Sequence, residues 1–154
     1  MNLTYKTATL QDLDLLTEIR IEVLLAANQL PPDTDMREVK AQSRAYYQQA
    51  LQNASHTAIL VFDGDAFIAA GGVSYYQVMP TYHNPTGKKA YIMNMYTRPA
   101  YRRRGIARKT LDLLVQDARK KGITSISLEA TAMGRPLYEQ YGFRPLNGEM
   151  ALPC

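Results

Sequence analysis

The stretch YTRPAYRRRGIARKTLDLLVQDARKKG, Tyr96 to Gly122, places three consecutive arginines and a glycine where a helical pattern begins. The amino end of a helix carries unpaired N–H groups and positive dipole character, so added cations work against the helix. The same end of a helix binds anions well, and Gly105 lets a ligand come close to the backbone. The segment therefore predicts a bound phosphate or pyrophosphate, held in a turn between a strand and a helix.

Two interpretations of this segment compete. Three arginines in a row are, by themselves, more typical of a solvated basic face of a surface helix. The glycine, the small Ala107, the preceding hydrophobic strand and the following helix all favour an anion site instead. Two common phosphate motifs, Gly-x-x-x-x-Gly-Lys-Ser/Thr and Gly-x-Gly-x-x-Gly, are absent from the chain. We therefore expect a phosphate-binding turn of another kind.

The rest of the chain predicts an α/β domain spanning residues 1–154, with a mixed, mostly antiparallel twisted sheet. Alternating apolar residues indicate about six or seven strands, and helical periodicity indicates about four helices. The expected strands are residues 3–8, 57–63, 66–79, 90–97 and 123–130, with one or two short strands around Asn147-Gly148. The expected helices run from residue 10 to a break at 28–35, from about 35 to 51, from 105 to 121, and from 136 to 141.

Three local signals refine this pattern. Thr9 is a plausible helix N-cap with Asp12 three residues later, close to a capping box. Gly64-Asp65 between two strand patterns indicates a hairpin turn. Gly71-Gly72 inside the strand at 66–79 indicates a bulge or a close approach of another segment.

Composition places the chain among ordinary globular proteins, with 46% hydrophobic and 21% charged residues. A net charge of +4 suits an anionic ligand, but no nucleic-acid-binding motif is recognisable, so we expect no nucleic-acid partner. No apolar run approaches the roughly 20 residues of a membrane span, and no signal peptide is visible, so we expect no membrane association. The single cysteine, Cys154, favours a reducing cytoplasm.

Two motifs carry a resemblance to a known family. RRRGIA, Arg102 to Ala107, matches Arg/Gln-x-x-Gly-x-Gly/Ala and resembles the acetyl-coenzyme A (acetyl-CoA) signature of the GNAT (Gcn5-related N-acetyltransferase) superfamily. LYEQYGFRP, Leu137 to Pro145, resembles the second motif of that family and falls where the family has it. The resemblance implies a single GNAT-type domain that moves an acetyl group from acetyl-CoA to a primary amine by direct attack. It also makes a homodimer an option, because dimers are common in the family.

The resemblance also implies roles for particular residues. The pantetheine arm of coenzyme A would pair with the strand at Met95, Tyr96 and Thr97. Tyr138 would lie near the thioester sulfur and protonate the leaving thiolate, although a tyrosine that merely packs is the alternative. Many members carry Asn and Ala where this chain has Thr131 and Gly134, so the Thr131 hydroxyl would take the place of the Asn side chain in the contact with coenzyme A. The pyrophosphate would be bound by Arg103, Arg104, Gly105, Ile106, Ala107 and Arg108.

The strand at 90–97 has no carboxylate that could act as the general base. Glu129, at the end of the strand at 123–130, is the preferred candidate, and Glu22 and His83 are further options. Nothing suggests a metal site, because His56 and His83 lie far apart in the sequence and have no cysteine partners.

The acceptor is expected over the first two helices and the loop at 80–89. A mixture of aromatic and acidic groups there favours a cationic small molecule or a peptide amine. A non-catalytic acyl-CoA-binding sensor is the alternative function. The sequence argues against a serine hydrolase, because Gly72–Tyr76 lacks the second glycine of a nucleophile elbow. The groups expected around the acceptor are Glu18, Glu22, Tyr46, Tyr47, Tyr82 and His83.

Overall fold

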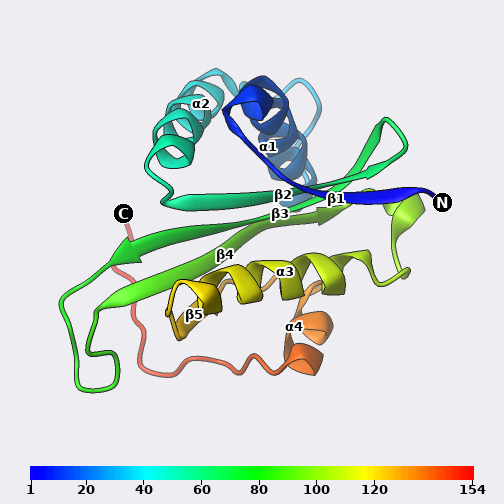
Figure 1. Ribbon diagram of the computed structural model, residues 1–154. Helices are drawn as coiled ribbons and strands as arrows, with labels where there is room; N and C mark the ends of the chain where they lie inside the picture. Colours follow the sequence, from blue (N-terminus) through cyan, green and yellow to red (C-terminus); the bar gives the residue numbers. More distant parts are fainter.

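One five-stranded sheet runs through the computed structural model, which describes residues 1–154 (Figure 1). Its spatial order is β1-β2-β3-β4-β5, and every pair is antiparallel except β4 and β5, which are parallel. The strands are β1 (Leu3–Thr7), β2 (His56–Asp63), β3 (Ala66–Gln77), β4 (Lys88–Thr97) and β5 (Ser125–Leu128). The helices are α1 (Leu13–Ala27), α2 (Arg37–Gln52), α3 (Ile106–Lys120) and α4 (Arg135–Tyr141), with 3-10 turns at Leu10–Asp12 and Pro99–Tyr101.

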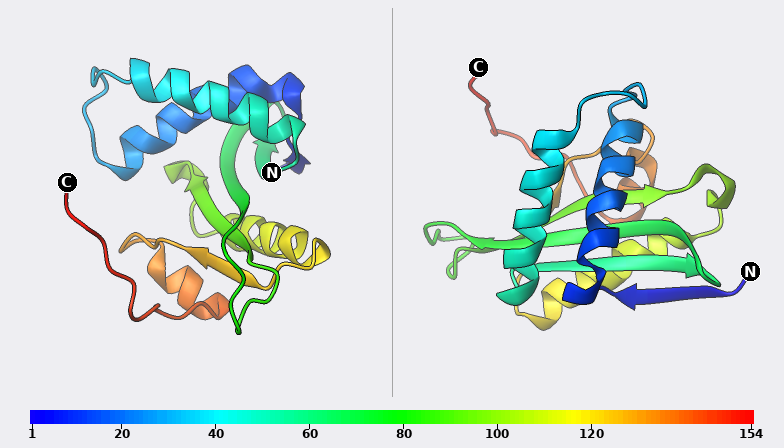
Figure 2. Two further views of the ribbon diagram at one scale, coloured as in Figure 1. Left: turned by 90° about the vertical axis from the view of Figure 1, so that its left-hand side faces the viewer. Right: turned by 90° about the horizontal axis from the view of Figure 1, so that it is seen from above.

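Two helical layers cover the two faces of this sheet (Figures 1 and 2). Helices α1 and α2 lie on one face, and α3 and α4 lie on the other. Each helical layer forms a separate hydrophobic cluster with the sheet. Helices α1 and α2 pack over Leu60 and Ala70, and α3 packs over Val73 and Ile92. The predicted α/β class, mixed sheet and four helices are confirmed.

The predicted strand count of six or seven is wrong, because the sheet has five strands. Residues 143–154 contain no strand, although one or two were expected around Asn147-Gly148. A two-residue turn makes a hairpin only when long alternating segments flank it. Here Pro145 and Pro153 lie within six residues on either side of the turn, and each removes a backbone donor.

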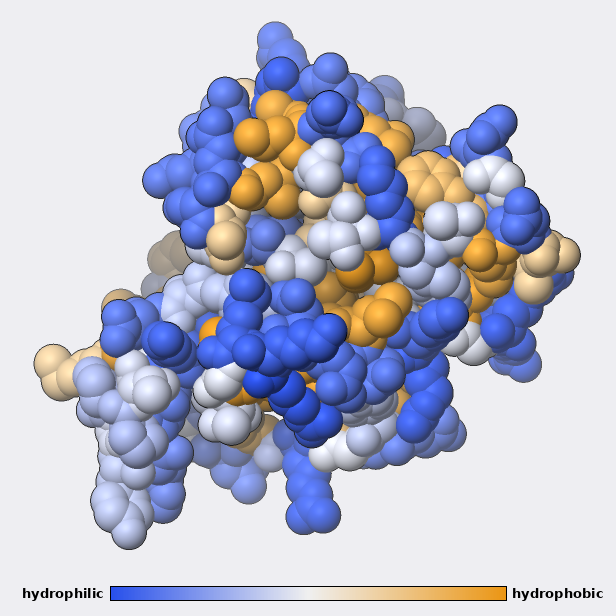
Figure 3. Space-filling model, viewed as in Figure 1, coloured by the Kyte–Doolittle hydropathy of each residue, from blue (hydrophilic) through white to orange (hydrophobic).

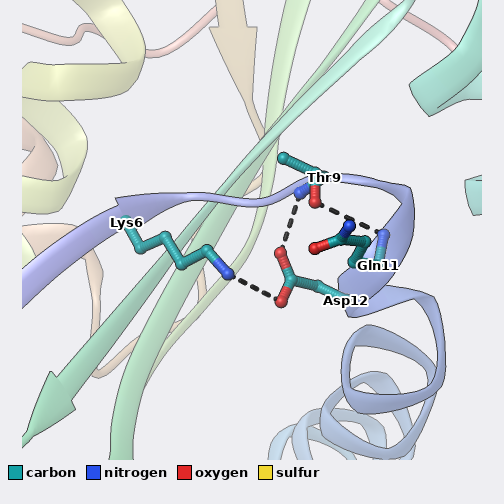
Figure 4. Close-up of polar contacts among 4 residues, drawn as sticks. All are labelled: Lys6, Thr9, Gln11 and Asp12. Carbon is teal, nitrogen blue, oxygen red and sulfur yellow. Dashed lines mark hydrogen bonds and ion pairs between the residues drawn. The ribbon is translucent and has the colours of Figure 1, made fainter.

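The predicted cap at Thr9 joins β1 to α1 (Figure 4). The backbone N–H of Thr9 donates to Asp12 Oδ2 at 2.8 Å, and Gln11 N–H donates to Thr9 Oγ1 at 3.3 Å. Lys6 on β1 adds an ion pair to Asp12 at 2.9 Å. The capping box is confirmed, with one 3-10 turn between it and α1.

A bulge interrupts the pairing of β3 with β4. Ala70 pairs with Tyr96 and Gly72 pairs with Met93, so Gly71 alone faces two residues of β4, Asn94 and Met95. The bulge expected at the glycine pair is therefore present, but its extra residue belongs to β4. Asn94 takes a positive φ of 59° to accommodate it.

Gly71 also allows the close approach that the sequence indicated. A Cβ atom at this position would lie 2.6 Å from Met95 Sδ and 2.8 Å from Thr110 Cγ2 of α3. Such distances are far inside van der Waals contact, so any side chain here would displace Met95 or α3. The glycine thus allows the first turns of α3, and Met95 of β4, to pack this closely against β3.

Hydrophilic side chains cover most of the face shown in Figure 3, with apolar side chains between them chiefly over the α1–α2 layer and near the middle. Scattered apolar groups of this kind mark no site by themselves.

None of the helices combines the length and the apolar character that crossing a bilayer requires.

Candidate functional site

The turn between β4 and α3 carries a run of backbone donors without acceptors. None of the six N–H groups from Arg103 to Arg108 donates to an acceptor within the chain. Gly105 is the N-cap of α3 and adopts φ +77°, and Arg103 also takes a left-handed φ of 63°. Successive unpaired N–H groups at the positive end of a helix are an arrangement that can bind an anion.

The arginines around this turn are free of carboxylate partners. Arg103, Arg104 and Arg108 form no ion pair within the chain and are exposed. Arg104 lies over the ring of Tyr101 and Arg108 over the ring of Tyr141, which orients both guanidinium groups while leaving their charge unpaired. The turn therefore concentrates positive charge that no residue of the chain neutralises.

Two contacts anchor the same turn to the sheet. Tyr101 donates to Asp63 Oδ2 at 2.8 Å, and Arg102 Nε donates to the carbonyl oxygen of Thr97 at 3.3 Å. The Tyr101 phenol, together with the backbone N–H of Asn2, keeps the pKa of Asp63 below its usual range. Ile106 is 2% exposed and its side chain lies in the core, so only its backbone N–H is available to a ligand at this turn.

Strand β4 offers an unpaired edge beside this turn. Its pairing with β5 covers only Lys89–Ile92 against Ser125–Leu128, so the edge of residues 93–97 has no neighbouring strand on that side. Figure 2 (left) shows the two strands diverging. The unpaired edge contains the predicted Met95, Tyr96 and Thr97, and amide groups of a ligand can add to an edge of this kind.

Helix α4 holds Tyr138 against Thr131 and Gly134. The Thr131 hydroxyl oxygen accepts a bond from Gly134 N–H at 3.1 Å, and a Cβ on Gly134 would lie 3.0 Å from the Tyr138 ring. The ring also packs edge-on against Phe143. Burial raises the pKa of the Tyr138 phenol, whose oxygen has no hydrogen-bond partner in the chain. This phenol therefore stays protonated at neutral pH.

Glu129 and Tyr138 line one groove of about 950 Å³ between β5, α3 and α4. Glu129 is exposed, and its carboxylate accepts a long bond of 3.5 Å from the Tyr91 hydroxyl. The structure thus brings the two predicted catalytic residues to one groove. The turn at residues 103–108 lies at the other end of α3 and is connected to α4 by the stacking of Arg108 on Tyr141.

The other base candidates are differently placed. Glu22 accepts two bonds from Arg98, at 3.0 and 2.9 Å, and these bonds lower the pKa of its carboxyl. His83 is exposed in the loop after β3. No cluster of three or more His, Cys, Asp or Glu side chains is arranged to hold a metal ion.

A second pocket of about 260 Å³ lies between the α1–α2 layer and the sheet. Sequence reasoning named Tyr46 and Tyr47 there but missed the rest. The sequence shows His56, Ser74 and Asn94 as polar residues within strands that are otherwise apolar. The sequence alone does not show that their side chains lie on the same face of the sheet. The polar residues that line the pocket are Arg20, Gln42, Ser43, Tyr46, Tyr47, His56, Ser74 and Asn94.

His56 is a buried residue in the wall of this pocket. Its Nδ1 lies 2.9 Å from the Tyr46 hydroxyl and 3.2 Å from Ser74 Oγ, whereas Nε2 has no partner and faces Gly72. Burial, with the charge of Arg20, lowers the pKa of His56 to about 4. The imidazole is therefore neutral at physiological pH.

The chain resembles known proteins over nearly its whole length. Residues 23–143 match the family described as the acetyltransferase (GNAT) family. A predicted acetyltransferase from Clostridium acetobutylicum, solved with acetyl-CoA, is 33% identical with a TM-score of 0.90, covering 98% of this chain and 96% of that one. A GCN5-related N-acetyltransferase from Ralstonia eutropha JMP134 is 25% identical with a TM-score of 0.85, covering 99% of each chain. Glucosamine-6-phosphate N-acetyltransferase from Arabidopsis thaliana, at 13% identity and a TM-score of 0.72 over 99% of each chain, shares the fold alone. No curated protein sequence matches significantly.

The depressed pKa of His56 predicts a loss of stability on acidification. The unfolded chain takes up a proton near pH 6.5 and the folded chain only near pH 4, so stability is full above 6.5 and falls as the pH drops towards 4. The contribution amounts to about 3 kcal/mol of unfolding free energy. Denaturant unfolding at successive pH values should show a flatter dependence for His56→Gln than for the unchanged chain.

The matched control is His83→Gln, which alters the only other histidine, in an exposed loop. It should retain the acid-dependent loss of the unchanged chain. Parallel curves for the unchanged chain and His56→Gln between pH 7 and 4 would contradict the assignment.

Proposed function

Since the chain belongs to the acetyltransferase (GNAT) family, we propose that it is an N-acetyltransferase that moves the acetyl group of acetyl-CoA to a primary amine. The amine belongs to a small molecule or a peptide and attacks the thioester directly while both substrates are bound. The observation that carries this proposal is the run of six unpaired backbone donors at residues 103–108, next to an unpaired strand edge. The relative from Clostridium acetobutylicum, solved with acetyl-CoA, supports the choice of cosubstrate.

The residues of the turn fit a pyrophosphate. Backbone N–H groups from Arg103 to Arg108 would donate to its oxygens, and the three unpaired guanidinium groups would neutralise its charge. Met95 and Thr97 would exchange backbone hydrogen bonds with the pantetheine amides along the free edge of β4, beside Tyr96. Thr131, whose oxygen already accepts from Gly134, retains its hydroxyl proton for a further contact.

The chemical step needs one acid and one base. Glu129 first removes one proton from the ammonium form of the acceptor, directly or through water, so that the nitrogen can attack. The nitrogen then bonds to the carbonyl carbon, the carbon–sulfur bond breaks, and Tyr138 gives its proton to the departing sulfur. The second proton that the nitrogen loses on becoming an amide restores the phenol of Tyr138 through solvent. A half-buried and unpartnered phenol suits the first role, since its proton is available at neutral pH.

The location and assembly of the protein belong to the same proposal. We place the enzyme in the cytoplasm because its single cysteine favours a reducing compartment, and we keep a homodimer as an option from the family resemblance. Size-exclusion chromatography with light scattering would test the second point.

Replacing Arg103 and Arg104 together by alanine should raise KM for acetyl-CoA by about 10- to 100-fold, because each removes a charge-assisted contact with phosphate. KM for the amine should change far less. Initial rates of thiol release measure both constants. Arg37→Ala, which removes an exposed arginine of α2, is the control and should leave both constants unchanged.

Equal increases in the two constants would count against a pyrophosphate at this turn. Binding of acetyl-CoA without thiol release, across a broad panel of amines, would favour the sensor over the enzyme. Failure to bind acetyl-CoA would contradict both the enzyme and the sensor proposals.

Tyr138→Phe should lower kcat by about 100-fold while leaving KM for acetyl-CoA nearly unchanged, because the leaving thiolate loses its proton donor but no binding group. Tyr141→Phe is the matched control, since this tyrosine lies one turn later and bonds to Asp112 at 2.7 Å. Steady-state kinetics with saturating acetyl-CoA provide the comparison. A Tyr138→Phe enzyme with unchanged kcat would reduce Tyr138 to a packing residue.

Glu129→Gln should lower kcat/KM for the amine by about 100-fold near pH 7, where the amine arrives protonated. The difference from the unchanged enzyme should narrow above the pKa of the amine, since a base is then no longer needed. Glu139→Gln serves as control, because Glu139 lines the same groove and pairs with Arg135. If both variants have the same pH–rate profile as the unchanged enzyme, Glu129 is not the base.

A further inference from the structure

The pocket between the α1–α2 layer and the sheet touches β4 at the bulge. Met93 and Asn94 both contribute to its wall, although consecutive strand residues normally face opposite sides. The extra residue in β4 is the reason, because it places two successive side chains on one face. Met95, the next residue, packs against the α3 cluster on the opposite face. The pocket therefore borders the start of the free strand edge proposed to bind pantetheine.

Arg20 is the only charged side chain in the wall of this pocket. The other lining residues are uncharged at neutral pH, since His56 is neutral there. Arg20 donates one hydrogen bond, from Nη1 to Asn94 Oδ1 at 3.0 Å, and forms no ion pair. A guanidinium group has five N–H donors, so four of them have no partner within the chain. A half-buried cation in this state favours an oxyanion as its missing partner.

The acidic residues expected to attract a cationic acceptor are already in ion pairs. Glu18 binds Lys40 at 2.7 Å, and Glu22 holds Arg98 through two bonds. Asp14 is paired with Arg44. No carboxylate lines the pocket, so its electrostatic preference is for a negative group, the reverse of what the composition of these helices suggested.

The size and the polar wall of the pocket narrow the class of ligand. A volume of about 260 Å³ suits a small molecule better than a peptide chain. The Tyr46 hydroxyl, Ser74 Oγ and His56 Nδ1 contact one another within 3.2 Å and form a neutral polar wall. A group of this kind orients a ligand by hydrogen bonds without contributing charge.

We propose that the acceptor is a small amine that also carries an oxyanion, a carboxylate or a phosphate, and that the guanidinium of Arg20 binds this oxyanion. The amine end then points towards the bulge of β4, where the proposed thioester edge begins. This inference rests on the proposed acetyltransferase function and adds its substrate class. Asn94, which bonds both Arg20 and the Tyr47 hydroxyl, holds the guanidinium in place.

The test is thiol release from acetyl-CoA with amines matched in pairs. Glycine and 4-aminobutanoate are compared with their carboxamides, 2-aminoethyl phosphate with 2-aminoethanol, and putrescine represents dications. At least one oxyanion-bearing amine should exceed its uncharged partner about 10-fold or more in kcat/KM. Comparison of the two carboxylate pairs with the phosphate pair shows which of the two oxyanions is preferred. Preference for the uncharged partners or for putrescine would overturn the inference while leaving the acetyltransferase proposal intact.

Arg20→Met keeps an unbranched apolar stem and removes the charge of the guanidinium group. It should raise KM for the preferred amine about 10- to 100-fold without changing the Kd for acetyl-CoA, and Arg20→Lys should recover part of the loss. An unchanged Kd also shows that the variant is folded. An unchanged KM for the amine in Arg20→Met would overturn the inference.

A binding measurement separates this inference from the failure of the proposed function. If no amine releases thiol, thermal unfolding with 4-aminobutanoate or 2-aminoethyl phosphate, in the presence of coenzyme A, reads occupancy of the pocket directly. A rise in Tm that disappears in Arg20→Met supports the oxyanion site even without turnover. No rise in Tm with either compound, combined with no turnover, overturns it.

Discussion

The extra residue in β4 is the constraint on which the rest of the site depends. A regular strand would place Met93 and Asn94 on opposite faces and would present a continuous edge to β5. With one residue more than β3 can match, β4 turns both side chains towards the α1–α2 layer, and its pairing with β5 ends at Ile92. Gly71 makes this arrangement possible, because no side chain fits between the bulged strand and α3. One local irregularity thus opens a strand edge and builds a wall of the second pocket.

The turn before α3 places positive charges where the dipole of the helix is already positive. Cations at a helix amino terminus are unfavourable, and this turn adds Arg103, Arg104 and Arg108 to unpaired N–H groups. The aromatic rings of Tyr101 and Tyr141 hold two of these guanidinium groups without neutralising them. A bound polyanion would stabilise such a concentration of unsatisfied donors, and the turn holds these donors in place before any ligand binds.

Local features of the site were predictable from the sequence, and features that join distant segments were not. Gly105 and its neighbours form a contiguous turn, so a short stretch of sequence contains all the determinants of the predicted anion site. The number of strands depends on hydrogen bonds between distant residues, and the expected strands after Phe143 do not form. The acidic character of α1 was misleading for the same reason, because Lys40 and Arg98, the partners of Glu18 and Glu22, are brought to α1 only by folding.

The two proposed binding sites meet at β4 from opposite faces of the sheet. The anion turn belongs to the α3 layer, whereas Arg20 and the neutral polar wall belong to the α1–α2 layer. An acceptor bound on one side and a thioester bound along the strand edge would therefore approach each other without competing for the same space. This arrangement favours direct attack within a ternary complex over a covalent enzyme intermediate, because the reacting groups are brought together by binding alone. A buried His56 is tolerated next to Arg20 because a neutral imidazole forms part of the polar wall without placing a second positive charge where the guanidinium would repel it.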